Sequence, residues 1–256
     1  MYRIRLMDGF HATSYGDAVA EIYDELFTPD GWEMYGVSET ADTVDFLAKA
    51  AAGAAALEVG AGTGRIALAL ADRGVAVTAV EVSAAMVRRL RAKPGGAELA
   101  VVHGDFLTVP IPGRFRLIYA VFNTVMAFAT QENQVAFFAR AGDLLTRDGV
   151  LVIEHSVPPE RGSPGLLLRR LTADQVLASA VSYDPASQTA VNQHIVFREE
   201  GLRLIPSTVR HIWPSEMDLM ARLAGLRMRS RHGGWHHERY AASSKRHVST
   251  YTFGDV

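Results

Sequence analysis

The stretch EVGAGTG places one acid and three glycines at a turn between an apolar run and a predicted helix. Glu58 precedes the turn, and Gly60, Gly62 and Gly64 stand at alternate positions within it. Glycines let the backbone approach a ligand closely, and open α/β sheets bind ligands at the carboxyl ends of their strands. A carboxylate beside the turn repels a pyrophosphate but suits a ligand that carries an ammonium group. We therefore expect a ligand-binding turn that favours a cationic group.

A second acid stands at the end of the next predicted strand. Glu81 ends the apolar run VAVTAVE, a placement that suits a ribose with two free hydroxyls. The dinucleotide pattern G-x-G-x-x-G is not met, because Arg65 stands where its last glycine belongs. Arg65 and Glu58 thus disfavour the alternative of a nicotinamide dehydrogenase. An amino acid joined to a nucleoside meets both demands, and S-adenosylmethionine is such a molecule.

The ordered motifs resemble those of the class I S-adenosylmethionine-dependent methyltransferases over roughly residues 15–153. EVGAGTG resembles the family's first motif, and Glu81 resembles its ribose-binding acid. HGDF resembles the adenine site, with Asp105 toward the exocyclic amine and Phe106 against the ring. FRLIYAVFN resembles the strand that ends beside the methionine group. The resemblance implies S-adenosylmethionine as the cofactor, bound by Tyr15, Tyr23, Glu58, Gly60, Gly62, Gly64, Glu81, Val82, Met86, Asp105, Phe106 and Phe122.

The segment IYDELF is similar to small-molecule methyltransferases of bacterial secondary metabolism, including enzymes that methylate amino sugars. In that group, tyrosines of an N-terminal helix close over the cofactor, which implies this role for Tyr23 and Tyr15. A core aromatic on an amphipathic helix is the alternative for Tyr23. The amino-sugar enzymes place a histidine shortly after the fourth strand, where this chain has FNTVMAF. The implied function is methyl transfer to a small organic acceptor in natural-product biosynthesis, at an N, O or C atom.

Two residues at the ligand-facing end of the predicted sheet are catalytic candidates. Methyl transfer from a sulfonium is an in-line displacement, so the protein mainly aligns the reactants, and a general base is optional. His155 follows Glu154 directly after the fifth strand and is the candidate base, with a surface-loop histidine as the alternative. Glu154 either orients His155 or holds the substrate. Asn123, after the fourth strand, either aligns the reactants or caps a helix.

The adjacent pair His236 and His237 raises the question of a metal, because imidazole is a common metal ligand. Adjacent residues of a strand point to opposite faces of the sheet. We therefore predict no metal site, and a solvated turn is the preferred interpretation of GGWHHERY.

The order of the elements predicts the fold. Strands alternate with helices through the first part of the chain, which favours a parallel sheet wrapped by helices. The predicted fold class is α/β: a Rossmann-like, mostly parallel seven-stranded sheet with helices on both faces and an antiparallel β insertion after the fifth strand. We assign residues 1–50 to a helical lid, 51–155 and 214–256 to the cofactor-binding core, and 156–213 to an inserted β cap over the substrate. Candidates to line the roof of that cap are Trp213, Met217, Met220 and Trp235, with plain core packing as the alternative.

Composition excludes several classes of function. A formal net charge of −2 over 256 residues gives no basic field for nucleic acid, and the lack of cysteine excludes disulfides and thiolate chemistry. The sequence contains no apolar run of bilayer-spanning length, and its start does not resemble a signal peptide. We expect a cytoplasmic protein that meets a small-molecule methyl acceptor, with no nucleic-acid or membrane partner; a homodimer is left open. The alternative function is a non-catalytic S-adenosylmethionine-binding or regulatory protein.

Overall fold

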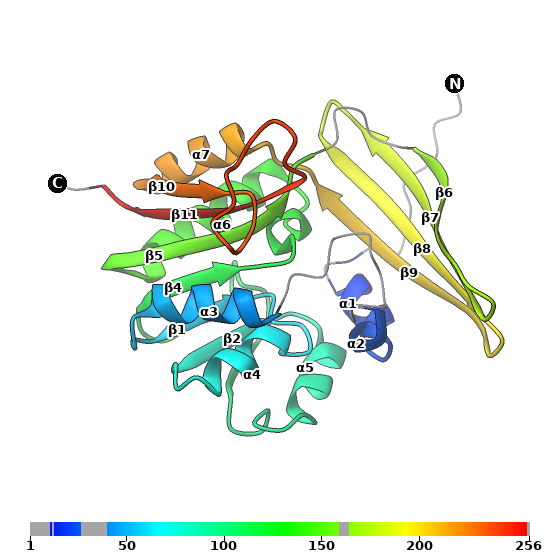
Figure 1. Ribbon diagram of the computed structural model, residues 1–256, viewed down its shortest axis with the longest axis horizontal. Helices are drawn as coiled ribbons and strands as arrows, with labels where there is room; N and C mark the ends of the chain where they lie inside the picture. The colour runs from blue at the N-terminus through cyan, green and yellow to red at the C-terminus, as the bar shows by residue number, and fades with distance from the viewer. Residues whose placement is uncertain (1–10, 12, 27–39, 159–163, 255–256) are drawn as a thin grey trace.

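The computed structural model describes residues 11, 13–26, 40–158 and 164–254 and contains two β-sheets (Figure 1). The larger one, sheet A, has seven strands in the order β10-β11-β5-β4-β1-β2-β3. The five neighbouring strands β5, β4, β1, β2 and β3 are parallel. Strand β11 is antiparallel to β5, and β10 is antiparallel to β11, so β10 runs in the direction of the other five. The predicted fold class is confirmed. The strands of sheet A are β1 (Ala56–Val59), β2 (Val77–Glu81), β3 (Ala100–His103), β4 (Phe115–Ala120), β5 (Leu145–Ser156), β10 (Leu226–His232) and β11 (Arg246–Phe253).

Helices cover both faces of sheet A, because its central strands are apolar on both sides; all four residues of β1 are buried. On one face, Leu47 and Ile66 from the helices pack with Leu117 of β4. On the other face, Phe137 and Met217 pack with Ile118. The first face carries α3 (Thr40–Ala51), α4 (Arg65–Ala71) and α5 (Ala84–Arg91), and the second carries η2 (Thr124–Ala127), α6 (Gln131–Leu144) and α7 (Pro214–Leu223).

The smaller sheet, sheet B, is inserted between β5 and α7 and is antiparallel in the order β6-β7-β8-β9. The expected insertion is therefore confirmed. In the sequence, the β runs on either side of REEGL predict only two strands, and the stretch before them has loop-like signals. The structure forms two further strands in that stretch. These strands are β6 (Gly165–Leu171), β7 (Gln175–Asp184), β8 (Thr189–Arg198) and β9 (Gly201–Arg210).

A buried arginine fastens sheet B to the core. Arg210, the last residue of β9, is 4% exposed. Its guanidinium donates to Glu216 Oε1 at 2.7 Å and to Gln188 Oε1 at 2.7 Å, and it also donates to Gln134 on α6. The Arg210 side chain thus links β9 to the turn before β8 and to two helices of the core, α6 and α7.

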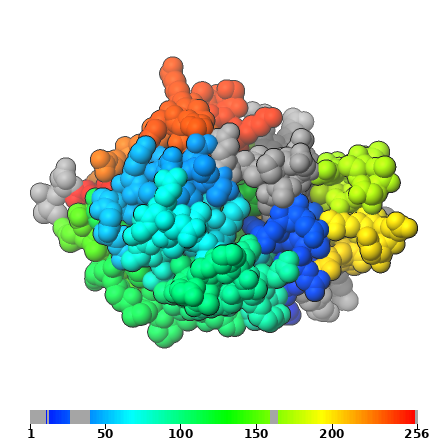
Figure 2. Space-filling view, turned by 60° about the horizontal axis from the view of Figure 1, so that its bottom comes forward, coloured from blue at the N-terminus to red at the C-terminus, as the bar shows by residue number. Residues whose placement is uncertain are grey.

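The short helices α1 (Ser14–Val19) and α2 (Tyr23–Leu26) lie between the core and sheet B. Figure 2 shows them as the blue surface between the cyan and green core and the yellow strands. Arg203 of β9 donates to the Ala18 carbonyl at 3.1 Å and pairs with Glu21 at 2.7 Å. Part of the predicted lid, residues 1–10, 12 and 27–39, lies outside the described residues. No helix within the described ranges is long and apolar enough to cross a membrane.

Candidate functional site

The glycine turn connects β1 to α4, and each glycine has a separate reason to be glycine. Gly60, Gly62 and Gly64 have φ angles of 71°, 56° and 82°, in the left-handed region that side chains disfavour. A Cβ on Gly60 would lie 2.7 Å from Thr124 Cγ2, and one on Gly64 would lie 2.8 Å from Leu90 Cγ. A Cβ on Gly62 would meet nothing within 4 Å. Packing therefore explains two of the glycines, while Gly62 leaves an open side for a ligand.

The carboxylate of Glu81 holds this turn from the end of β2. Its Oε2 accepts a hydrogen bond from the Gly62 N–H and its Oε1 accepts one from the Ser83 N–H, both at 2.8 Å. Burial raises the pKa of Glu81, against the effect of these backbone donors. Each carboxylate oxygen can still accept a further hydrogen bond. Ser83 in turn caps α5, because its Oγ accepts a hydrogen bond from the Met86 N–H.

Glu58 lies beneath the turn and is 2% exposed. The Tyr119 hydroxyl donates to its Oε2 at 3.2 Å. Burial raises the pKa of Glu58 to about 8, although the bond from Tyr119 and the charge of Arg65 lower it. In this structure the carboxyl faces Tyr119 and the core, so a direct contact with a ligand's ammonium group stays a prediction.

The N-terminal helices meet the turn through two tyrosines and two acids. Tyr15 and Tyr23 pack with the cluster that contains Met86 and Phe122, and burial raises the pKa of Tyr23 to about 12. The acids, Asp17 and Asp24, are not among the predicted site residues. Ser83 Oγ donates to Asp17 at 2.6 Å, and Thr63 Oγ1 donates to Asp24 at 2.6 Å. The repeated acids in GDAVAEIYDELF were the available signal for this docking.

The predicted site residues after β2 and β3 differ in how far they are exposed to solvent. Val82 is half-buried beside the turn. Asp105 is exposed and accepts a hydrogen bond from the Leu107 N–H at 2.9 Å. Phe106 is 3% exposed, and its ring lies 5.5 Å from that of Phe137 in the core over α6. The aromatic cluster of this face thus buries Phe106, and its contact with the adenine ring stays a prediction.

The end of β4 is strained at two consecutive residues. Phe122 and Asn123 have φ angles of 56° and 64°, which are uncommon for residues other than glycine. Glu154 Oε2 accepts from the Phe122 N–H at 3.0 Å, and Asn123 Oδ1 accepts from the Ser156 N–H at 2.6 Å. Asn123 precedes η2 but makes no side-chain capping bond, so the helix-cap alternative is wrong. These bonds fix the ends of β4 and β5 against each other.

His155 is not in a loop: it lies within β5 and is 0% exposed. Its Nδ1 is 2.6 Å from the Ser156 carbonyl oxygen, and its ring stacks on His247 with centroids 5.8 Å apart. Its Nε2 is buried with no partner among the described residues. Burial lowers the pKa of His155 to about 4. A general base must reach the acceptor, and this buried imidazole does not, so the structure does not support His155 in that role.

Glu154 points to the other face of β5 and does not orient His155. Its carboxylate accepts from Trp235 Nε1 at 3.2 Å in addition to the Phe122 N–H. Burial raises the pKa of Glu154. Trp235 is therefore a buried structural partner of β5 and not a roof residue.

The other candidates for the roof over the substrate lie on α7 or directly before it. Met217 and Met220 are buried against the core face of sheet A, so their expected position over the substrate is wrong. Trp213 is 39% exposed at the start of α7. Apolar residues of an amphipathic helix mark its core side here and not a pocket.

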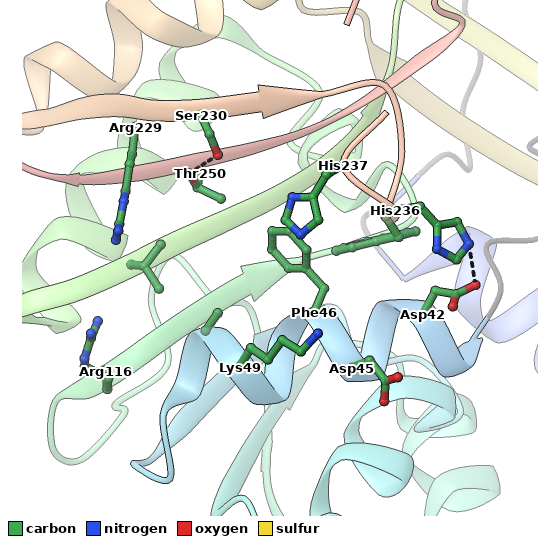
Figure 3. Close-up of a pocket in the computed structure, with 13 residues that line it drawn as sticks. Asp42, Asp45, Phe46, Lys49, Arg116, Arg229, Ser230, His236, His237 and Thr250 are labelled. Carbon is green, nitrogen blue, oxygen red and sulfur yellow. Dashed lines mark hydrogen bonds and ion pairs between the residues drawn. The ribbon is translucent and has the colours of Figure 1, made fainter. Parts of the chain in front are cut away.

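A groove of about 610 Å³ lies along α3, beside β10 and β11 (Figure 3). His236 and His237 line it with Phe46. His236 pairs with Asp42 at 3.0 Å, whereas His237 Nδ1 lies 3.3 Å from His232 Nε2. The groove runs along a face of sheet A and is distinct from the turn at the ends of β1 and β2.

The family model for a methyltransferase domain matches residues 56–149, which carry the glycine turn and Glu81. The solved structure of the CcbJ methyltransferase from Streptomyces caelestis is 35% identical; it aligns with 96% of this chain and 100% of its own, at a TM-score of 0.88. The chain belongs to the S-adenosylmethionine-dependent methyltransferases.

More distant methyltransferases agree with this assignment. The cypemycin N-terminal methyltransferase of a Streptomyces species is 26% identical over 75% of this chain and 80% of its own. The amino pentose methyltransferase CalS10 from Micromonospora echinaspora, solved with S-adenosylmethionine bound, shares the fold at a TM-score of 0.65 and 23% identity; it covers 90% of this chain and 96% of its own.

The methyltransferase uses S-adenosylmethionine as its cofactor, and two observations of its site fit that group. The open side of Gly62 gives the cofactor room against the backbone, and Glu81 presents a carboxylate suited to ribose hydroxyls. Neither the alternative of a nicotinamide dehydrogenase nor that of a non-catalytic binding protein finds support in these matches.

Proposed function

We propose that this methyltransferase transfers a methyl group to an amine nitrogen of a small organic molecule in natural-product biosynthesis. The named activities of its relatives, at the N-terminus of cypemycin and on an amino pentose, support an amine acceptor. The observation that carries the proposal is the chemical character of one face of sheet B. We call this the inner face, the side that packs on α1 and α2 through Leu177, Val196 and Ile205.

The same face continues into a polar stripe. Residues paired across antiparallel strands share a face, so Ser179, His194 and Ile205 lie on one side of the sheet. Ser179 Oγ is 2.8 Å from His194 Nδ1. Asn192 Nδ2 donates to Ser207 Oγ at 3.3 Å. Ser179 and His194 are buried, whereas Asn192 and Ser207 are half-buried. The stripe therefore offers an acceptor uncharged hydrogen-bonding groups at Asn192 and Ser207, on the face that packs on α1 and α2.

The electrostatics of the stripe suit an amine that must attack as a free base. Burial, together with the charge of Arg169, lowers the pKa of His194 to about 4, and burial lowers the pKa of His211, just after β9. Both imidazoles are therefore neutral at pH 7. An uncharged wall next to a guanidinium disfavours an ammonium ion and favours the neutral amine. No protein base is then needed once the acceptor has lost its proton to solvent.

We infer distinct positioning roles for residues around the turn. Glu81 accepts the ribose hydroxyls, Gly62 admits the cofactor against the backbone, and Tyr23 covers it from α2. Phe122 and Asn123 align the reacting groups at the end of β4. S-adenosylmethionine supplies a methyl group already activated on a sulfonium. The N–C bond forms as the S–C bond breaks, so alignment is the main contribution of these residues and is worth up to about 7–11 kcal/mol.

The test is an acceptor panel of small amines, phenols, alcohols and carbon nucleophiles, with methylated products detected by mass spectrometry. We expect methylation of amines only, with a rate that rises through the pKa of the acceptor amine. Product from oxygen or carbon acceptors alone would overturn the choice of nitrogen. If calorimetry shows cofactor binding but no acceptor is methylated, the non-catalytic alternative gains support.

A further inference from the structure

The side of sheet B opposite its inner face, which we call the outer face, is exposed and apolar. The pairing of neighbouring strands gives it three cross-strand rows of four residues. The rows are Leu171, Val176, Phe197 and Leu202; Leu168, Ala178, Ile195 and Leu204; and Leu166, Ala180, Gln193 and Pro206.

Large side chains of these rows stand in solvent. Their exposed fractions run from 46% for Phe197 to 70% for Leu166, with Leu168, Leu171, Leu202 and Leu204 between them. Gln193 is the one polar residue in the rows, and none of the twelve carries a charge. Isolated exposed leucines are ordinary, but a contiguous apolar face on a monomer marks an interaction site.

We infer that the outer face packs against the outer face of a second copy of this chain, so that the methyltransferase is a two-fold symmetric dimer. This inference does not depend on the identity of the methyl acceptor. A flat apolar face without charges is complementary to itself, which is what an isologous interface requires. Two sheets that meet face to face pack about 10 Å apart with their side chains interleaved.

The size of the face is sufficient. With the next paired row of Ser182, Val191 and Thr208, which is also uncharged, the face runs over about seven residues of each long strand. Four strands about 4.8 Å apart, with roughly 3.4 Å for each residue along them, then span about 20 Å by 25 Å. That is on the order of 500 Å² for each copy, and two copies reach the roughly 1,000 Å² that a biological interface needs.

Charge disfavours an anionic membrane as the occupant of this face. The hairpin ends of sheet B carry four acids, Asp174, Asp184, Glu199 and Glu200, which balance the four arginines of the sheet other than the buried Arg210. Two of these arginines, Arg198 and Arg203, are already paired with Glu25 and Glu21. Attachment to anionic lipid needs an excess of basic residues around an apolar surface, and these charged residues do not provide it. In a dimer they lie at the rim, where water screens them.

The first test measures mass in solution. Sedimentation velocity of the wild type should give twice the 27.9 kDa chain mass. The double variant Leu168→Glu with Leu204→Glu should sediment as a monomer and keep its circular dichroism and its affinity for S-adenosylhomocysteine. The matched control is Leu223→Glu, because Leu223 is 75% exposed on α7, away from sheet B; it should remain dimeric.

A second measurement covers the case in which the double variant fails to fold. The chain has no cysteine, so single cysteines at Leu168, Ile195 or Leu204 can form a disulfide only between copies. Oxidation should yield a covalent dimer from at least one of them, whereas Leu223→Cys should form no covalent dimer. Any of three results would overturn the inference: a monomeric wild type, a double variant that remains dimeric, or co-flotation of the monomer with phosphatidylglycerol vesicles.

Discussion

At the scale of single residues, the site depends on backbone as much as on side chains. Gly62 contributes an open side and an N–H that donates to Glu81. Glu81 contributes a carboxylate that is already ordered by two backbone donors before any ligand arrives. Ordering in advance lowers the entropy that binding would otherwise cost. Substitutions of Gly62 test the space that the turn leaves for the cofactor, and substitutions of Glu81 test the charge that binds it.

Gly62→Val should abolish cofactor binding, because its side chain would occupy the open side of the turn. The φ of 56° also costs stability, so a matched control is needed. Gly113→Val serves, since Gly113 has a φ of 90° and a Cβ there would likewise meet nothing within 4 Å. Calorimetry with S-adenosylhomocysteine should show binding in the control alone. Equal affinities in the two variants would remove the turn from the cofactor site.

Glu81→Gln should weaken cofactor binding by at least about 1.5 kcal/mol, the lower value for hydrogen bonds to a charged group. The amide also turns an NH2 group toward one of two backbone N–H donors. Glu81→Asp should keep part of the affinity. The control Glu98→Gln changes an exposed acid and should bind as the wild type does. An unchanged dissociation constant for Glu81→Gln would show that ribose hydroxyls lie elsewhere.

At the scale of elements, β5 and β11 carry a buried pair of imidazoles. His155 and His247 stack at 5.8 Å, and each has a buried Nε2 without a partner among the described residues. Burial lowers both pKa values, and His211 lowers the pKa of His155 further. Neutral imidazoles are thus part of the folded state.

Folding stability should therefore fall as the pH drops from about 6.5 to about 4. The unfolded chain binds a proton at His155 below its ordinary pKa of 6.5, and the folded chain does so only near 4. The contribution of the neutral His155 to the free energy of unfolding is fully present above pH 6.5. Between pH 7 and pH 5 about 2 kcal/mol of this free energy is lost. Urea unfolding at both pH values should show a smaller loss for His155→Gln than for the wild type. His103→Gln, which changes an exposed histidine, is the control.

The difference in the free energy of unfolding between the wild type and His155→Gln also cancels the effect of the buried carboxyls, because both proteins contain them. Burial raises the pKa of Glu58 and Glu154, so these groups favour the folded state as pH falls. An identical pH dependence in His155→Gln and the wild type would contradict the neutral imidazole. Activity is a further readout: retained turnover would agree with the position of His155 in the core.

The sequence predicted the parallel half of the fold because its signal is local. Each strand from β1 to β5 is a short apolar run bounded by turn or helix signals. The first strands of sheet B were missed because GLLLRRL does not alternate, and a register shift between Leu168 and Arg170 interrupts its pairing. His155 was misplaced because β5 extends through Ser156 to pair with β11. That pairing joins distant segments, which no local pattern reveals.

At the scale of the whole molecule, three parts meet at the cofactor turn. Asp17 and Asp24 of the N-terminal helices accept from Ser83 and Thr63 beside it. On its other side, the same pair of helices binds sheet B, where Glu25 pairs with Arg198 at 3.1 Å. The cofactor turn and the proposed acceptor face are thus connected through α1 and α2.

Cofactor binding should therefore order α1 and α2, and Asp24 should influence affinity without touching the ligand. Hydrogen exchange at residues 14–26 should slow when S-adenosylhomocysteine is added, while the distant β6–β7 hairpin stays unchanged. Asp24→Ala removes the acceptor of the Thr63 hydroxyl and of Lys93 at 2.9 Å. We expect binding about 3–10-fold weaker, since one hydrogen bond contributes about 0.5–1.5 kcal/mol. Glu25→Ala, the neighbouring acid that faces sheet B, should leave affinity unchanged. Equal losses in both variants would indicate general loosening of the helix, and no loss in either would show that the helices dock independently of the cofactor.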